Sequence, residues 1–248
     1  MADQIDFTIH GDDMQGVSIC LDPGESVRAE PGAMMWMEEG VTMDTSTGGG
    51  LMSGLKRAIG GESFFITTFT NEGGGLATVG FAADYPGKII PVDLSRGEVL
   101  CQRNAYLCSA NGIEVSVAFT KKLGAGFFGG EGFILQRLRG DGLGFIHAGG
   151  HVIERELQVG ETLRVDTGCI VGFESTVDYD IKMIKGVKSM LFGGEGLFYA
   201  TLQGPGLCWI QTTPFSRLAD RVMSASGGSS KGEHKRFGGM IGSMLGGD

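Results

Sequence analysis

The chain has 248 residues and a formal net charge of −9, since 29 acidic residues outnumber 20 basic ones. Nucleic acid and anionic lipid repel such a chain unless its basic residues cluster in one place. Glycine is the outlier, with 45 residues against a usual share of about 7%, while proline contributes only 6. This balance disfavours a Pro/Gly linker or a collagen helix and indicates short strands joined by tight turns.

The N-terminal segment, MADQIDFTIHGDD, lacks both the basic and the apolar region of a secretory signal peptide. Within it, DFTIH at residues 6–10 predicts a first strand. The chain has no apolar run of about eighteen residues, so no helix spanning a membrane is expected. The cysteine number is odd and without C-x-x-C spacing, which disfavours a disulfide framework or a zinc site. Buried free thiols in a reducing cytoplasm are expected for Cys20, Cys101, Cys108, Cys169 and Cys208.

Two glycine motifs alternate along the chain and divide it into three units. The motif L-x-x-G-E-x-[VL] begins at Leu21, Leu94 and Leu157. The motif G-G-E-x-[FL] occupies residues 60–64, 129–133 and 193–197. The units that they delimit lie near residues 17–83, 88–147 and 151–212. Glycine suits the turn of each GE motif, and its glutamate is expected to bond the turn or to remain solvated.

Each G-G-E motif precedes a strand pattern, a glycine turn and a second strand pattern, which together predict a β-hairpin. In the second unit these are GFILQRL, GDG and LGFIHA. Since a unit of about 60 residues is too small to bury a good core alone, the three units are expected to share one core. The sequence therefore predicts one all-β domain over residues 1–212, built from three pseudo-symmetric strand-rich repeats with short helical connectors. A C-terminal helix and a flexible glycine-rich tail are expected over residues 213–248.

The stretch LKRAIGGESFF at residues 55–65, with the later GGEGF and GGEGLFYAT segments, resembles a family of uncharacterised bacterial proteins. That family is related to the yeast altered-inheritance-of-mitochondria protein number twenty-four, and the resemblance covers residues 5–212. It implies a fold similar to the tryptophan RNA-binding attenuation protein, a β-sandwich or barrel with internal duplication. It also implies a cytoplasmic bacterial protein of unsettled activity, with inner-membrane association in the mitochondrial relative. No ligand-binding residue follows from it, and RNA or tryptophan binding is an analogy of fold alone.

Two glycine-rich patterns are associated with chemistry elsewhere. Residues 124–129 match G-x-G-x-x-G, but a strand pattern rather than a helix follows, which favours a plain connector over a dinucleotide site. The equivalent carboxylates Glu62, Glu131 and Glu195 could meet on an axis around a cation, although turn bonding is favoured.

His147 and His151 suggest a metal site when they are considered with Glu154 and Glu156. Their i, i+4 spacing brings ligands together only on a helix, whereas HAGGH indicates a glycine turn flanked by surface histidines. No catalytic motif is present, so no enzyme activity, cofactor or metal is predicted.

Basic residues do cluster in the segments that precede the G-G-E glutamates, which we call the connectors: residues 51–61, 120–130 and 182–194. They contain seven of the 20 basic residues and no acidic residue, and apolar side chains stand beside the charges. If the connectors emerge at one end, they form a patch that fits an anionic membrane surface or a partner protein. The alternative is that they plug the end of the β-core with their lysines solvated. The candidate interaction residues are Lys56, Arg57, Lys121, Lys122, Phe127, Phe128, Lys188, Leu191 and Phe192.

After Pro214, SRLADRVMSA predicts an amphipathic helix of about ten residues, and SGGSSKGEHKR a flexible linker. The final FGGMIGSMLGG spaces Gly238, Gly242 and Gly246 four residues apart, as in close helix packing, and is too short to span a bilayer. It is expected to dock on the connector end, on another subunit or on a membrane surface, or to be disordered.

These patterns lead to two hypotheses from different classes. The leading one is a non-enzymatic interaction or scaffold protein, cytoplasmic and peripherally bound to a protein partner or to the inner face of the membrane. The second is a small-ligand or RNA-binding module resembling the attenuation protein, although the acidic charge and the scarcity of aromatics beside lysines disfavour nucleic acid. A homo-oligomer is left open. Connectors that gather at one end would favour the interaction hypothesis.

Overall fold

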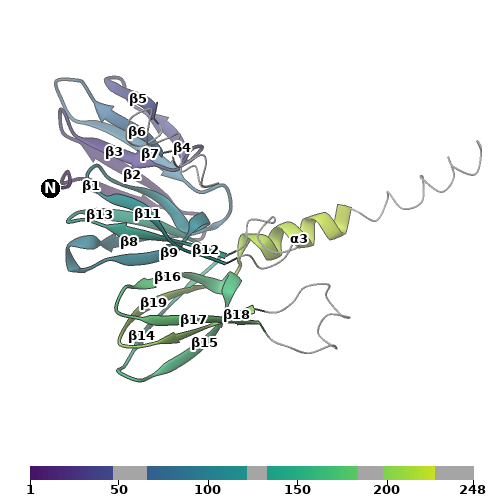
Figure 1. The fold of residues 1–248 in the computed structure, drawn as a ribbon. Coiled ribbons are helices and arrows are strands. Elements are labelled where there is room, and N and C mark those ends of the chain that lie inside the picture. The colour runs from purple at the N-terminus through teal and green to yellow at the C-terminus, as the bar shows by residue number, and fades with distance from the viewer. Residues whose placement is uncertain (47–65, 122–132, 184–197, 227–248) are drawn as a thin grey trace, which may run out of the picture.

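The computed structural model of the chain describes residues 1–46, 66–121, 133–183 and 198–226, which form an all-β molecule with a C-terminal α-helix (Figure 1). The all-β prediction is therefore confirmed. The first strand, β1 (Asp6–His10), coincides with the predicted DFTIH strand, and the helix, α3 (Phe215–Ser226), covers the predicted amphipathic segment. Within these described ranges, no helix is long and apolar enough to cross a membrane.

The strands that follow β1 fall into three successive groups of six, which we call units 1, 2 and 3. Unit 1 contains β2 (Gly16–Leu21), β3 (Ser26–Ala29), β4 (Met34–Met37), β5 (Val41–Ser46), β6 (Ile66–Asn71) and β7 (Ala77–Ala82). Unit 2 contains β8 (Gly87–Asp93), β9 (Val99–Gln102), β10 (Tyr106–Ala110), β11 (Glu114–Lys121), β12 (Phe133–Arg139) and β13 (Leu143–Gly149). Unit 3 contains β14 (Val152–Leu157), β15 (Thr162–Asp166), β16 (Ile170–Glu174), β17 (Asp178–Met183), β18 (Phe198–Gln203) and β19 (Gly206–Gln211). The described residues also include the short 3-10 helices η1 (Leu94–Arg96), η2 (Arg103–Ala105) and η4 (Thr167–Cys169).

The same four antiparallel pairings recur in every unit. In unit 1 they are β2–β7, β3–β6, β4–β7 and β5–β6. Unit 2 has the corresponding pairs β8–β13, β9–β12, β10–β13 and β11–β12. Unit 3 has β14–β19, β15–β18, β16–β19 and β17–β18. The pairing of the third strand with the sixth is irregular at the same place each time, between Met34 and Trp36, Tyr106 and Cys108, and Ile170 and Gly172.

Neighbouring units are joined by one further pairing, of the second strand of one unit with the third strand of the next. These pairs are β3–β10 and β9–β16. They produce two six-stranded sheets, sheet B (β5-β6-β3-β10-β13-β8) and sheet C (β11-β12-β9-β16-β19-β14). The remaining strands form sheet A (β1-β2-β7-β4) and sheet D (β15-β18-β17). Each unit is thus a two-layer sandwich that shares a sheet with its neighbour.

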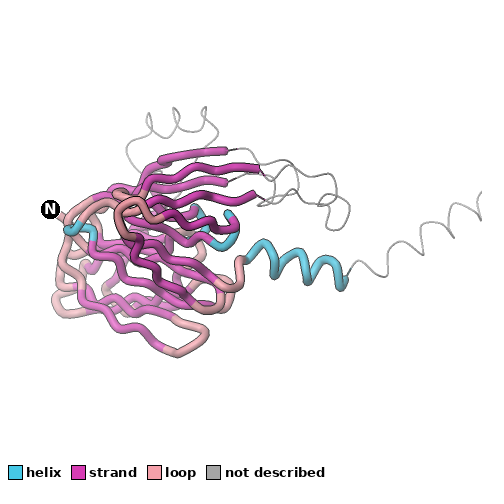
Figure 2. The backbone as a smooth tube through the Cα atoms, turned by 90° about the horizontal axis from the view of Figure 1, so that it is seen from below, coloured by secondary structure: helices cyan, strands magenta, loops and turns pink. Residues whose placement is uncertain are grey.

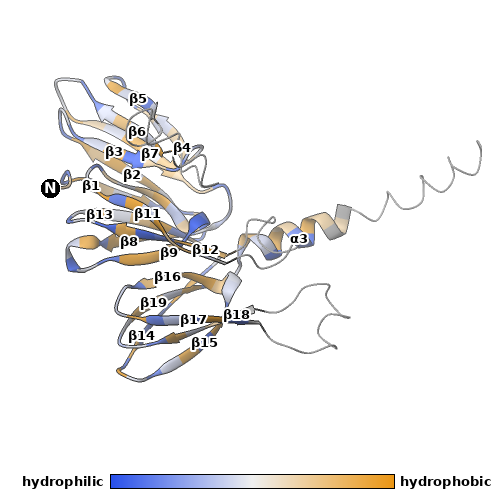
Figure 3. Cartoon of the chain, in the orientation of Figure 1, coloured by the Kyte–Doolittle hydropathy of each residue, from blue (hydrophilic) through white to orange (hydrophobic). Residues whose placement is uncertain are grey.

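Burial patterns give the order of the layers. Every residue of β9 and β10 is buried, whereas buried and partly exposed residues alternate along β2. Sheets B and C are therefore covered on both faces, and sheets A and D on one, as expected for a stack in the order A, B, C, D. Figure 3 shows hydrophobic residues along β9 and β12 in the middle of this stack. The sandwich form of the predicted fold is present, and the described strands close into no barrel.

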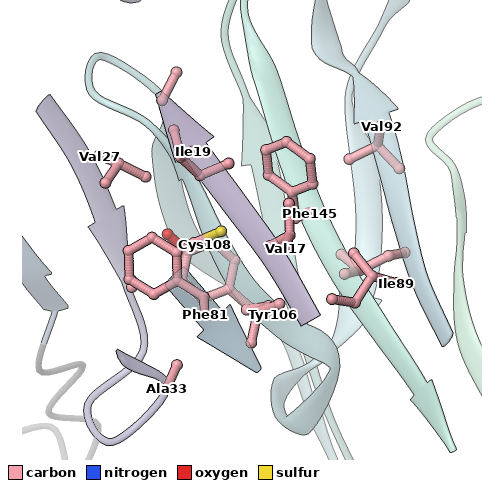
Figure 4. Packing of buried hydrophobic residues seen from close by; sticks show 14 of the residues in the cluster. Val17, Ile19, Val27, Ala33, Phe81, Ile89, Val92, Tyr106, Cys108 and Phe145 are labelled. Carbon is pink, nitrogen blue, oxygen red and sulfur yellow. The ribbon is translucent and has the colours of Figure 1, made fainter. Parts of the chain in front are cut away.

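The buried apolar residues divide into two clusters rather than one. The larger cluster joins sheets A, B and one face of sheet C, and Figure 4 shows part of it around Ile19, Phe81 and Phe145. The smaller cluster joins the other face of sheet C to sheet D. On β9, for example, Cys101 belongs to the first cluster and Leu100 to the second. The prediction of one shared core is therefore wrong for the described residues, because sheet C separates the two clusters.

The predicted hairpins are also wrong in their partners. The strands on either side of each glycine turn, β6 and β7, β12 and β13, and β18 and β19, lie in different sheets. The turns therefore carry the chain from one layer to the next. At the first of them, the buried Asn71 side chain donates to the carbonyl oxygens of Leu21 and Gly75 and accepts from the Gly73 amide, at 2.8–2.9 Å. The Asn71 side chain thus holds the turn itself and also ties it to the end of β2.

Candidate functional site

The three turns that join the second and third strands of the units lie side by side at one end of the sheets, which we call the turn end. They are residues 30–33, η2 and η4. The Glu30 amide donates to the Leu107 carbonyl oxygen just after η2, at 3.0 Å. The Gln102 side chain in turn donates to the Thr167 carbonyl oxygen in η4. Hydrogen bonds thus connect all three units at this end.

The strand ends that flank the connectors also lie at the turn end. In unit 1 the last pair, Ser46 with Ile66, is adjacent to the Ala29–Thr67 pair that leads into the first turn. In unit 3, Met183 pairs with Phe198, next to the Asp166–Tyr199 pair that leads into η4. Lys121 and Phe133 pair at the corresponding end of unit 2. The three connectors are therefore attached at one end of the molecule.

The connector side chains themselves fall largely outside the described residues. Of the predicted interaction residues, only Lys121 is described, as the last residue of β11. The others lie outside the described ranges: Lys56, Arg57, Lys122, Phe127, Phe128, Lys188, Leu191 and Phe192. The G-x-G-x-x-G segment, the G-G-E glutamates and the tail glycines also lie outside them. A single basic patch at the turn end remains a prediction.

A cavity of about 290 Å³ opens at the turn end, beneath the start of α3. Residues from sheets B and C, from η2 and η4 and from the segment before β8 contribute to its wall, together with one side of the helix. Most of the lining surface is apolar, and the polar groups are amides, an imidazole, hydroxyls and the carboxylate of Asp220. The lining residues are Tyr85, Gln102, Asn104, Ala105, His147, Gly168, Gln211, Pro214, Phe215, Ser216, Ala219, Asp220 and Met223.

His147 is the most enclosed polar residue of this wall, with only 2% of its surface exposed. Its ring meets the ring of Tyr85 edge-on, and the Tyr85 ring lies tilted against Phe215, with 5.1 Å between centroids. Burial lowers the pKa of His147 to about 4, so the imidazole is neutral at pH 7. Its Nδ1 atom is buried and has no hydrogen-bond partner among the described residues. The prediction of a surface histidine is therefore wrong at this position, whereas His151 is exposed as expected.

Two buried glutamines tie the wall of the cavity together. The Gln211 amide donates to the Gly168 carbonyl oxygen and accepts from the Gly149 amide, both at 2.8 Å. The Gln102 amide nitrogen is bonded to η4 in the same way. Part of the hydrogen-bonding capacity of each side chain is therefore used within the protein. Sequence reasoning missed both, although a glutamine at the end of an apolar strand pattern such as LCWIQ was a usable signal.

One ion pair and one aromatic contact hold α3 at the turn end. Asp166 accepts from the Gly168 amide at 2.8 Å and from the Arg217 guanidinium at 2.9 Å, which links η4 to the helix. Beyond its first turn the helix extends away from the sheets (Figure 2). Its apolar residues are largely exposed, with Val222 at 60% and Met223 at 71%. The helix thus presents an uncovered apolar stripe.

A second cavity adjoins the first and shares Tyr85, Asn104, His147 and Phe215 with it. Glu30 and Asp84 contribute the acidic groups of its wall. Burial raises the pKa of Glu30 to about 7, against the opposing effect of Arg103, and Asp84 raises it further. Burial also raises the pKa of Tyr85 to about 12. No group of three or more potential metal ligands occurs in the described ranges.

The GE turns have the structural role that was predicted for them at two of three positions. Gly24 and Gly160 adopt left-handed backbone angles, with φ of 88° and 79°. The carboxylate of Glu25 accepts from the Asp22 amide at 2.9 Å, and Glu161 accepts from the Gln158 amide at 3.0 Å. In unit 2 the corresponding glutamate forms ion pairs with two arginines of β12 instead. These motifs therefore shape the end opposite the cavity.

The chain matches the model of a known protein family. The family model described as mitochondrial biogenesis AIM24 matches residues 7–213, which is nearly all of the strand-forming chain. The chain belongs to the AIM24 family. The resemblance that the glycine motifs suggested is thereby confirmed at the level of the family. Similarity to the fold of the attenuation protein remains a prediction.

Two streptococcal proteins are similar to this AIM24 family member. An uncharacterised protein of Streptococcus pyogenes serotype M6 is 28% identical over 212 residues, covering 82% of this chain and 83% of the relative. A Streptococcus pyogenes protein of known crystal structure superposes with a TM-score of 0.74 at 25% identity, covering 90% of this chain and all of that protein. Neither description names an activity, so the function of the AIM24 fold has to be argued from the turn end.

Four free cysteines of this AIM24 family member lie within or beside the two clusters: Cys101 and Cys108 in the larger one, Cys208 in the smaller one, and Cys169 packed against the smaller one. Cys20 and Cys169 are only partly buried, so the prediction of buried thiols is wrong for these two. All five are free thiols, and Cys101, Cys108 and Cys208 are buried. Burial raises the pKa of the Cys101 and Cys108 thiols well above its ordinary value, which keeps them protonated and unreactive. They therefore pack as small apolar residues and are not candidates for catalysis.

Proposed function

We propose that this protein is a non-enzymatic interaction protein that attaches to anionic membrane surfaces through its turn end. The observation that carries the proposal is the exposed apolar stripe of α3 at the end where the three connectors are attached. Residues Phe215, Leu218, Ala219, Val222 and Met223 follow the i, i+3, i+4, i+7, i+8 spacing of an amphipathic helix. A helix with this pattern and an uncovered apolar face suits the interface of a bilayer.

The distribution of charge supports the same orientation. The chain as a whole is acidic, so most of its surface is repelled by anionic lipid. The connectors carry seven basic residues without an acidic one, and each basic residue near an anionic surface contributes about 1 kcal/mol. Because the connectors are attached at the turn end, we expect an approach with this end foremost to bring their charges and the apolar face of α3 to the lipid together.

Co-sedimentation with vesicles tests the proposal. We expect the full chain to sediment with vesicles of phosphatidylcholine and phosphatidylglycerol and to bind phosphatidylcholine alone much more weakly. The double variant Leu218→Asp, Val222→Asp should lose at least tenfold in vesicle affinity. Both side chains are exposed, so the variant is expected to fold normally.

A second variant separates charge from apolar contact. Replacing Lys56, Arg57, Lys121, Lys122 and Lys188 by glutamine should abolish the preference for phosphatidylglycerol. In the control variant, Arg96 and Arg139 are replaced by glutamine. Both lie at the opposite end of the sheets, so this variant should bind the vesicles as the natural chain does. Unchanged binding by the five-residue variant would overturn the electrostatic part of the proposal. If the natural chain sediments with neither type of vesicle, the whole proposal is wrong.

A further inference from the structure

We infer that the cavity beneath α3 is a binding site for a small uncharged aromatic molecule that carries one hydroxyl group. Its ring would pack against the rings of Tyr85 and Phe215, which already touch each other, and its hydroxyl would bond Nδ1 of His147. The cavity shares Phe215, Ala219 and Met223 with the apolar face of α3, but binding of a small molecule is measured without lipid, so the two proposals are tested separately.

The size of the cavity limits the ligand. Its volume of about 290 Å³ is at the lower end of the range of about 300–1,000 Å³ for small-molecule sites. A single substituted ring fits this space, whereas a nucleotide or a peptide does not. The wall is already formed by strands and 3-10 helices of two sheets, so little ordering is needed before a ligand binds.

The chemistry of the wall excludes an anionic ligand. Asp220 is the only charged residue among the described lining residues, and it is acidic. The imidazole of His147 is neutral at pH 7 because of its burial. A phosphate or carboxylate would therefore lose its hydration without gaining a cation. The rings of Tyr85 and Phe215 offer aromatic faces and edges instead, which favour another ring.

The unpartnered nitrogen of His147 indicates where the ligand is polar. A buried polar atom without a hydrogen bond costs about 1–3 kcal/mol, so a partner that reaches it recovers this free energy. A hydroxyl group can donate or accept, and it therefore suits either tautomer of the imidazole. The glutamine side chains nearby do not compete for it, because Gln211 bonds Gly168 and Gly149.

Phenol and toluene are matched probes for this site, because they differ in the one hydroxyl group. Titration of the full chain, followed by chemical shifts in NMR spectra, should show saturable binding of both at residues around the cavity. Phenol should bind about fivefold more tightly, which corresponds to the net contribution of about 1 kcal/mol from one hydrogen bond. Equal affinity for the two probes, or no saturable binding of either, would overturn the inference.

Two variants assign the effect to its residues. His147→Phe keeps a ring in place and removes Nδ1, so this variant should keep its affinity for toluene and lose the preference for phenol. His151→Phe replaces an exposed histidine outside the cavity and should behave as the natural chain does. Ala219 lies on the side of α3 that faces the cavity, so Ala219→Trp places a large side chain in it. This variant should bind both phenol and toluene at least tenfold more weakly. A phenol preference that survives in His147→Phe contradicts the assignment, and undiminished binding by Ala219→Trp contradicts the site.

Discussion

The ring of Tyr85 meets the ring of His147 at an interplanar angle of 86°, with 4.6 Å between the ring centroids. Tyr85 lies between units 1 and 2, and His147 lies near the end of β13, so the contact depends on the fold rather than on sequence proximity. It closes the inner wall of the turn-end cavity against water. The low pKa of His147 is a consequence of this closure, and it makes the stability of the protein sensitive to pH.

Acidification should destabilise the protein through His147. The unfolded chain binds a proton at this residue near pH 6.5, whereas the folded chain does so only near pH 4. Between these values the unfolded state binds more protons, so stability falls as the pH decreases. The loss across this window is about 3 kcal/mol, from about 1.4 kcal/mol per pH unit.

Denaturant unfolding between pH 4 and pH 7 measures this effect. Because Glu30 contributes its opposing slope to both chains, the effect of His147 is the difference between them: the unfolding free energy of the natural chain relative to His147→Phe should decrease by about 3 kcal/mol from pH 7 to pH 4. His151→Phe should retain the natural dependence. Parallel curves for the natural chain and His147→Phe would show that the imidazole is not the group responsible.

Glu30 should act in the opposite direction. Its folded pKa of about 7 lies above its ordinary value of 4.5, so the folded state binds more protons than the unfolded state between these values. Stability is then lost as the pH rises through this range. Glu30→Gln should be more stable than the natural chain at pH 8, by about 1–2 kcal/mol. At pH 4 the two should unfold alike.

The control for this experiment is Glu39→Gln, since Glu39 is exposed at the opposite end of unit 1. It should change the unfolding free energy by less than about 0.5 kcal/mol at either pH. If Glu30→Gln gains no stability at pH 8 relative to this control, the carboxyl group is better solvated than its burial indicates.

Gly87 should be intolerant of any side chain. A Cβ atom at this position would overlap the Ala148 carbonyl oxygen and lie 2.7 Å from Nε2 of His147. The backbone of β13 cannot retreat, because its strand is buried on both faces. Gly87→Ala should therefore destabilise the protein by more than about 3 kcal/mol.

Gly74→Ala is the matched control for this substitution. Gly74 is an exposed glycine of the β6–β7 turn, and no atom lies within 4 Å of its would-be Cβ. Thermal unfolding of the two variants should show a large decrease in midpoint for Gly87→Ala and a shift of a few degrees at most for Gly74→Ala. Similar midpoints would mean that β8 and β13 can separate to admit a methyl group.

Local patterns in the sequence predicted the elements whose formation depends on neighbouring residues. The strand at residues 6–10 and the amphipathic helix after Pro214 agree with β1 and α3. The choice of strand partners was not predictable in this way, since β6 and β7 are separated by a glycine turn and yet pair with strands of different sheets. Partner choice is decided by burial on both faces of sheets B and C, which no local pattern records.

The cavity was missed for a related reason. HAGGH indicated an exposed turn, and its second histidine does lie at the surface. The first histidine, His147, is buried because Gly87 leaves space beside it and Tyr85 covers it. Both residues belong to the segment around the start of β8 and not to the HAGGH turn. The attachment of the connectors at one end, by contrast, followed from the equivalence of the glycine motifs.

The strand pairing that joins neighbouring units could continue at either end of the stack. Among the described strands, β4 and β15 each leave one edge unpaired, although their counterparts β10 and β9 use that edge to bind the neighbouring unit. The molecule is in this sense a finite length cut from an array, and a gene that gained a further unit could lengthen it without redesigning its interior. The open edges of β4 and β15, and on β4 the exposed side chains of Met35, Trp36 and Met37, are therefore the places where another chain could add a strand.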